Sequence, residues 1–165
     1  MGLPPRFGLV TIHRAENTDD DARLNTIIDG LCLVAGRLPL VMPIHPRTRQ
    51  RLASLGALER LRQVVRVLEP VGYLEMLAMQ KRAEAIITDS GGIQKEAFFL
   101  QVPCITLRQE TEWVETVDLG WNRLVRDLSA PAIEAAVFGA RRPPATQAQP
   151  YGDGRAAFRI AAALG

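Results

Sequence analysis

The sequence predicts a doubly wound α/β fold, in which helices cover both faces of a Rossmann-like parallel sheet. Short apolar runs of strand length alternate with helical patterns, the arrangement of parallel strands joined by crossover helices. One of these runs breaks directly into a Ser-Gly-Gly turn that opens a helix. With 165 residues, 47% hydrophobic and 23% charged, the chain has the length and composition of one globular domain with a sizeable core.

Six apolar runs are candidate strands because each is short and is bounded by turn or helical patterns. In chain order they are residues 7–12, 40–44, 64–68, 85–88, 104–107 and 123–125. The helical patterns predict a helix that is capped by residues 17–19 and ended by Pro39, helices at residues 47–55, 73–80 and 93–100, a helix that is capped by residues 129–131 and ends at Gly139, and a last helix at residues 154–164.

Composition and charge exclude several classes of function. The net charge is +2 and aromatic residues make up 5% of the chain, without a basic stripe, so we expect no nucleic-acid partner. Cys32 and Cys104 lie in apolar runs, which favours buried reduced thiols and no metal site. No apolar run reaches the roughly 18 residues that span a bilayer, and the first residues do not form a secretion signal. We therefore expect a cytoplasmic protein without a membrane partner.

Polar residues follow the candidate strands at their carboxyl ends, where the ligands of doubly wound sheets bind. These residues are His13, Arg14, Glu16, Asn17, His45, Glu69, Asp89, Ser90, Arg108, Glu110, Thr111 and Glu112. Because parallel strands end on the same edge of a sheet, the sequence predicts one polar rim there.

The turn formed by Ser90, Gly91 and Gly92 is a candidate phosphate site. Glycines let backbone N–H groups approach an anion closely, and the helix that follows adds unpaired donors and the positive end of its dipole. Glu96 comes about one and a half turns later and can accept hydrogen bonds from sugar hydroxyls. Such a turn also serves packing, so the residues by themselves leave both roles open.

Five blocks of the chain resemble the non-hydrolysing UDP-N-acetylglucosamine 2-epimerases in their order and spacing. The blocks are residues 10–17, 43–46, 69–73, 88–96 and 108–112. The resemblance covers only the carboxyl-terminal half of such an enzyme, which folds as two Rossmann-like domains in the GT-B arrangement. It implies that residues 1–165 form one UDP-binding domain. It also implies that a proline-rich strap and terminal helix, residues 142–165, pack on an amino-terminal domain that the chain lacks.

The resemblance also implies roles for individual residues. Ser90, Gly91 and Gly92 would receive the UDP diphosphate, and Glu96 would bind the ribose hydroxyls. His13 matches a family histidine that lies beside the diphosphate and assists catalysis, and a histidine at a strand end can titrate near neutrality.

For each of four further residues, two roles are open. Arg14 and Glu16 are either substrate-binding residues or a structural ion pair. His45 falls in a block near a regulatory nucleotide-sugar site of some bacterial members, or is a simple turn histidine. Arg108 either neutralises phosphate charge or is solvated. In addition, Asp89 is expected to cap the amides of the phosphate turn.

The chain departs from the family pattern at two positions. Trp113 stands where many members have an arginine that reaches the diphosphate, so either Arg108 supplies the charge or the substrate is a different UDP-sugar, such as a diacetamido-hexuronate. Lys95 stands where a glutamate is usual, and we expect this helix-surface position to tolerate the change.

The reaction that the resemblance implies is inversion at C2 of a UDP-linked 2-acetamido sugar by a homodimeric enzyme, through elimination and re-addition of UDP, without a metal or redox cofactor. The carboxylates that move the C2 proton belong to the absent domain, so we expect this chain to bind UDP but not to turn over. Two alternatives remain: the carboxyl-terminal domain of a GT-B glycosyltransferase, and a stand-alone nucleotide-sugar-binding module.

Overall fold

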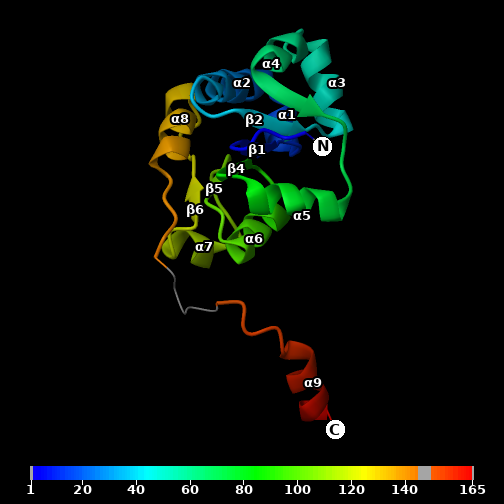
Figure 1. Cartoon of the computed structure of the whole chain (residues 1–165), viewed down its shortest axis with the longest axis vertical. Helices are drawn as coiled ribbons and strands as arrows, with labels where there is room; N and C mark the ends of the chain where they lie inside the picture. The colour runs from blue at the N-terminus through cyan, green and yellow to red at the C-terminus, as the bar shows by residue number, and fades with distance from the viewer. Residues whose placement is uncertain (1, 145–149, 165) are drawn as a thin grey trace.

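The computed structural model describes residues 2–144 and 150–164, and its centre is a six-stranded parallel sheet (Figure 1). The strands are β1 (Gly8–Thr11), β2 (Leu40–Pro43), β3 (Val65–Leu68), β4 (Ala85–Thr88), β5 (Cys104–Thr106) and β6 (Asn122–Leu124). Their order across the sheet is β3-β2-β1-β4-β5-β6, and every neighbouring pair is parallel. The predicted parallel sheet is confirmed, and all six predicted strands are present.

Helices cover both faces of the sheet (Figure 1). They are α1 (Ala15–Thr18), α2 (Asp21–Ala35), α3 (Pro46–Ser54), α4 (Leu58–Val64), α5 (Tyr73–Arg82), α6 (Gly91–Leu100), α7 (Val114–Asp118), α8 (Ala130–Gly139) and α9 (Ala156–Leu164). One apolar core lies between the sheet and helices α2, α3, α4 and α8, and a smaller core lies between the sheet and helices α5 and α6. This two-sided burial makes the sheet doubly wound.

The predicted cap of the first long helix is wrong. Asn17 and Thr18 belong to the short helix α1, and Asp20 caps α2 by accepting a hydrogen bond from the amide of Arg23. The sequence analysis also missed α1, α4 and α7, which have four, seven and five residues. Helices this short carry too little apolar periodicity to be recognised.

The strand order reverses direction between β1 and β4. β1 is followed by β2 on one side, and the chain then returns to place β4 on the other side. In sheets of this topology the crevice for a ligand opens where the order reverses, at the carboxyl ends of the two strands. The loops after β1 and β4 therefore meet at the position where a ligand is expected.

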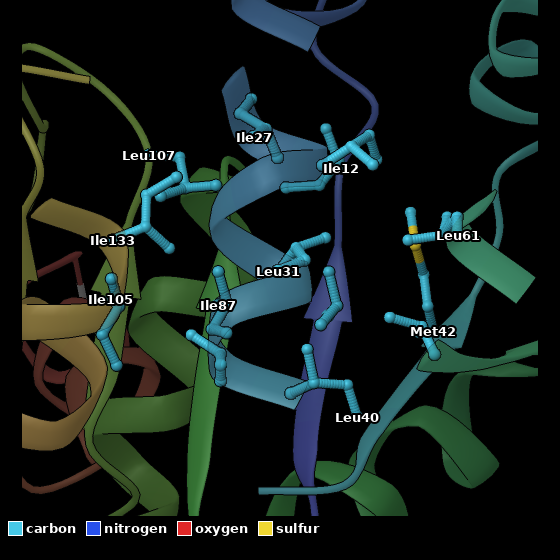
Figure 2. Packing of buried hydrophobic residues seen from close by; sticks show 14 of the residues in the cluster. Ile12, Ile27, Leu31, Leu40, Met42, Leu61, Ile87, Ile105, Leu107 and Ile133 are labelled. Carbon is cyan, nitrogen blue, oxygen red and sulfur yellow. The ribbon is translucent and has the colours of Figure 1, made fainter. Parts of the chain in front are cut away.

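Helix α2 packs closely against α8 at Gly30. Figure 2 shows Leu31 of α2 near the sheet residue Ile87, and Ile27 of α2 and Ile133 of α8 belong to the same buried cluster. A Cβ atom placed on Gly30 would lie 2.6 Å from Cδ1 and 2.9 Å from Cβ of Ile133. The glycine is therefore required by the close approach of the two helices.

Gly30→Ala is expected to lower the free energy of unfolding by about 1–2 kcal/mol, because the overpacking penalty exceeds the gain in helix propensity. Urea denaturation measures the change. Gly36→Ala is the matched control, since a Cβ atom at the end of the same helix meets only the carbonyl oxygen of Leu33, at 3.4 Å. Equal effects of the two substitutions would contradict the packing argument.

The terminal helix α9 lies apart from the sheet (Figure 1), and none of its residues is buried. Phe158 and Leu164 are exposed by 76% and 84%. Of the predicted strap, residues 145–149 lie outside the described residues. Tyr151, in the same segment, packs on α6 and the start of α7.

Candidate functional site

The loops after β1 and β4 are tied together at the carboxyl end of the sheet. The hydroxyl groups of Thr11 and Thr88, at the ends of these strands, lie 2.7 Å apart. The Thr88 hydroxyl also accepts a hydrogen bond from the amide of Ser90, at 3.0 Å. These contacts fix the start of the Ser-Gly-Gly turn against the neighbouring strand.

The turn leaves two backbone donors without acceptors. Ser90 is the N-cap of α6, and its Oγ accepts from the amide of Ile93 at 3.5 Å. Within the described part of the chain, the amides of Gly91 and Gly92 have no hydrogen-bond acceptor. Two free N–H groups at the positive end of a ten-residue helix form an anion site.

Glu96 lies on α6 and is held by a buried glutamine. Gln80 of α5 is fully buried, and its Nε2 donates to Glu96 Oε2 at 2.6 Å. This bond uses one carboxylate oxygen and leaves Glu96 Oε1 to accept from a ligand. The sequence analysis missed Gln80, because a glutamine in an amphipathic helix gives no signal that it is buried.

Asp89 does not cap the phosphate turn as predicted. Its carboxylate is fully buried and accepts from the amides of His13, at 3.1–3.2 Å, and Arg14, at 3.0 Å, and from the side chain of Asn17, at 3.1 Å. Asp89 therefore organises the loop after β1. The prediction chose the wrong partner because the sequence does not reveal that β1 and β4 are neighbours.

His13 and His45 lie side by side at the rim. The Nδ1 atom of His13 is 3.4 Å from Asp89 Oδ1, and the two imidazole rings are 5.8 Å apart and tilted by 35°. His45 also caps α3, because its Nδ1 accepts from the amide of Arg47 at 3.2 Å. The turn role of His45 is therefore observed, and no described residue hydrogen-bonds its Nε2, which can contact a ligand.

A cavity of about 240 Å³ lies beside both histidines. Its other walls are mostly apolar and come from the ends of β1 and β2, the loop after β3, and helices α5 and α6. The remaining lining residues are Thr11, Ile12, Pro43, Ile44, Pro70, Val71, Met76 and Ile93. Glu69, directly after β3, pairs with Arg49 at 2.6 Å. An apolar cavity with two polar groups at its mouth fits an aromatic base or a sugar ring.

Of the two interpretations of Arg14 and Glu16, the structural ion pair between them is not formed. Glu16 pairs with Arg23 instead, at 3.2 Å. The guanidinium group of Arg14 has no hydrogen-bond or ion-pair partner among the described residues, and its Nη2 lies 3.6 Å from the position of a Cβ atom on Gly91. Arg14 thus places its guanidinium group beside Gly91, next to the carboxylate of Glu112, with which its charge interacts.

Arg108 is neither solvated nor free. It is 7% exposed and donates from Nη1 and Nη2 to the carboxylate of Glu112, at 2.9 and 3.0 Å. Its Nε is buried without a partner. Because its charge is already neutralised by Glu112, Arg108 is a weaker candidate for a phosphate ligand than Arg14.

Hydrogen bonds from Arg108 lower the pKa of Glu112 from 4.5 to about 2. A lowered carboxylate pKa stabilises the fold above pH 4.5, and this contribution disappears as the pH falls toward 2. The difference in unfolding free energy between the native chain and Glu112→Gln is therefore expected to shrink over that pH range, measured by urea denaturation. Glu59→Gln removes the exposed pair with Arg62 and is the control. A difference that stays constant with pH would contradict this assignment.

The part of the chain that the structure describes contains neither a membrane-spanning helix nor a cluster of metal ligands. None of its helices combines the length and the apolar character needed to cross a bilayer. Among the same residues, no three His, Cys, Asp or Glu side chains are grouped as metal ligands.

Comparisons with known proteins identify the chain's relatives. A family model described as UDP-N-acetylglucosamine 2-epimerase matches residues 3–165. A Pseudomonas aeruginosa protein named UDP-2,3-diacetamido-2,3-dideoxy-D-glucuronate 2-epimerase is 45% identical over 164 residues, which cover 98% of this chain and 45% of the relative. A Methanocaldococcus jannaschii protein named UDP-N-acetylglucosamine 2-epimerase is 41% identical over 160 residues, 93% of this chain and 43% of the relative.

A solved structure gives the same result. The crystal structure of the M. jannaschii UDP-GlcNAc 2-epimerase in complex with UDP-GlcNAc and UDP has a TM-score of 0.87 to this chain at 40% identity, covering 96% of this chain and 45% of that one. The chain thus spans less than half the length of these relatives and corresponds to their carboxyl-terminal half.

Proposed function

Because the chain belongs to the UDP-N-acetylglucosamine 2-epimerase family, we propose that it is the nucleotide-binding part of an isomerase that inverts C2 of a UDP-linked 2-acetamido sugar. One observation carries the proposal. The free amides of Gly91 and Gly92 and the unpaired guanidinium group of Arg14 converge where the strand order reverses. This arrangement suits the two negative charges of a diphosphate.

The other residues of the rim receive roles that fit this pose. Glu96 accepts hydrogen bonds from the ribose hydroxyls through the oxygen that Gln80 leaves free. The apolar cavity takes the uracil end of the nucleotide, next to Pro70. His13, oriented by Asp89, faces the diphosphate and stabilises the charge that develops on it.

The proposed reaction has two steps. A base removes the C2 proton while the C1–O bond breaks, so that its electron pair leaves with UDP and C1 and C2 become a double bond. UDP then adds back to C1 while a proton is delivered to the other face of C2. We assign the proton transfers to carboxylates in the remainder of the full-length enzyme, so the 165-residue chain incubated with UDP-GlcNAc is expected to show no conversion.

Two UDP-sugars are candidates for the substrate. UDP-N-acetylglucosamine is the substrate class named for the M. jannaschii relative, whereas the P. aeruginosa relative is named for a 2,3-diacetamido glucuronate and is 45% identical. Trp113, at the position of the family arginine, favours the second. Incubating the full-length enzyme with each UDP-sugar separately distinguishes the candidates, because only the true substrate yields its C2 epimer without an acceptor.

The terminal helix α9 is proposed to pack on the rest of the full-length enzyme. Its apolar side chains, Phe158, Ile160 and Leu164, are all exposed, and an apolar helix face needs a surface to bury against. Residues 142–165 would then be the part of the nucleotide-binding domain, residues 1–165, that contacts the other half of the enzyme.

Calorimetric titration of the chain with UDP tests the proposal. We expect saturable binding that Ser90→Ala and Glu96→Ala each weaken by about tenfold, since each removes a polar contact to the nucleotide. Glu134→Ala, on the far helix α8, is the control. The absence of binding to a folded chain, or binding that none of the site variants affects, would contradict it.

A further inference from the structure

The two residues at which the chain departs from the family pattern are in contact with each other. Lys95, on α6, places its Nζ atom 4.4 Å from the centre of the Trp113 ring. This distance is that of a cation–π contact. Lys95 therefore does not simply occupy a tolerant surface position, and the two departures form one unit.

Trp113 also binds the phosphate turn directly. Its Nε1 donates a hydrogen bond to the carbonyl oxygen of Gly91 at 2.8 Å. That carbonyl and the N–H group of Gly92 belong to the same planar trans peptide unit and point in opposite directions. A hydrogen bond that fixes the Gly91 carbonyl therefore also fixes the direction of the free Gly92 N–H.

Tyr151 completes the unit from the segment that precedes α9. Its ring packs edge-on against Trp113, with centroids 5.7 Å apart, and lies 4.5 Å from Lys95 Nζ. Its hydroxyl group donates to Glu115 Oε2 at 3.3 Å. Further edge-on contacts with Phe98, at 5.5 Å, hold the ring on α6. Lys95 Nζ is thus in contact range of both aromatic rings, and Trp113 contacts both Lys95 and Tyr151.

We propose that Trp113 is a positioning residue for the diphosphate site, and that Lys95 and Tyr151 hold its indole ring. The packing of Tyr151 on α6 and the binding of UDP are then linked. Displacing Tyr151 from α6 loosens the Gly91–Gly92 peptide and lowers the affinity for UDP. Bound UDP in turn stabilises the packing of Tyr151 on α6 by the same factor. This inference rests on the proposed binding of UDP at the turn.

The indole N–H signals of the ¹⁵N-labelled chain test the inference. The chain has two tryptophans, and the buried Trp121, which directly precedes the edge strand β6, serves as an internal reference. We expect the Trp113 signal to shift on addition of UDP, with the same saturation curve as the calorimetric titration. Tyr151→Ala is expected to shift the same signal without UDP, and Phe158→Ala, on the uncovered helix α9, is expected to leave it in place.

The affinity for UDP provides the second readout. Trp113→Phe keeps most of the ring but removes the indole N–H, and is expected to weaken UDP binding by about three- to tenfold. Tyr151→Ala is expected to weaken it less, and Tyr151→Phe, which keeps the ring, least of all. One outcome would overturn this inference but not the proposed function. In that outcome UDP binds to the native chain and Ser90→Ala weakens the binding, but UDP does not shift the Trp113 signal and Trp113→Phe does not change the affinity. A folded chain that does not bind UDP would overturn both the proposed function and this inference.

Discussion

Asp89→Asn is expected to lower the free energy of unfolding by about 2–4 kcal/mol, the largest stability effect at the rim. Both oxygens of the buried carboxylate accept hydrogen bonds. Oδ1 accepts from the amide of His13, and Oδ2 accepts from the amides of His13 and Arg14 and from the side chain of Asn17. An asparagine would turn an amide N–H₂ group toward these donors in either orientation. Several hydrogen bonds to a charged acceptor are lost, and a buried donor is left without a partner.

The same substitution should release the loop after β1. His13 would lose the carboxylate 3.4 Å from its Nδ1, and its imidazole would no longer be held toward the site. Urea denaturation measures the stability, and the ¹H–¹⁵N spectrum reports the loop. Asp127→Asn replaces an exposed carboxylate with the same change in charge and is the control. If the two variants were equally stable, Asp89 would not organise the loop.

Arg14→Ala is expected to weaken UDP binding by at least about tenfold, the largest effect of a single side chain on affinity. Charge-assisted hydrogen bonds to phosphate contribute roughly 1.5–3 kcal/mol. The guanidinium group of Arg14 forms no hydrogen bond or ion pair among the described residues, so its N–H donors are available to the ligand, and its charge also acts on the nearby carboxylate of Glu112. The unfolding free energy should change little, since no described contact of the guanidinium group is lost. Calorimetry gives the affinity and urea denaturation gives the stability.

Two variants sharpen this prediction. Arg14→Lys keeps the charge but not the planar guanidinium group, and should recover part of the affinity. Arg123→Ala removes an exposed arginine on the edge strand β6 and controls for net charge. A similar loss of affinity in Arg14→Ala and Arg123→Ala would mean that UDP responds to the overall charge and not to a placed cation.

Most of the fold could be predicted because its signals are local. A buried parallel strand is a short apolar run whatever surrounds it, and residues 85–88 were assigned without error. The cap of α8 at Ser129 likewise follows from Ser-Ala-Pro alone. The sheet order does not follow from any single segment, but alternation of strands and helices restricts it strongly.

Parts of the rim could not be predicted, because the partners of its residues are far apart in the sequence. Asn17 was assigned to a helix cap, yet its side chain joins Asp89, 72 residues away, to the carbonyl of Leu107. Arg108 is interpreted from its place after a strand, but the availability of its charge to a ligand depends on its ion pair with Glu112. Only the packed structure decides which arginine is neutralised and which remains free.

The central claim is that the Ser-Gly-Gly turn holds a nucleoside diphosphate. A crystal structure of the chain grown with UDP tests it most directly. The account predicts the diphosphate at the amides of Gly91 and Gly92 beside Arg14, and the ribose at Glu96. UDP bound elsewhere, for example in the hollow between β6 and α8 lined by Arg123 and Arg126, would contradict it.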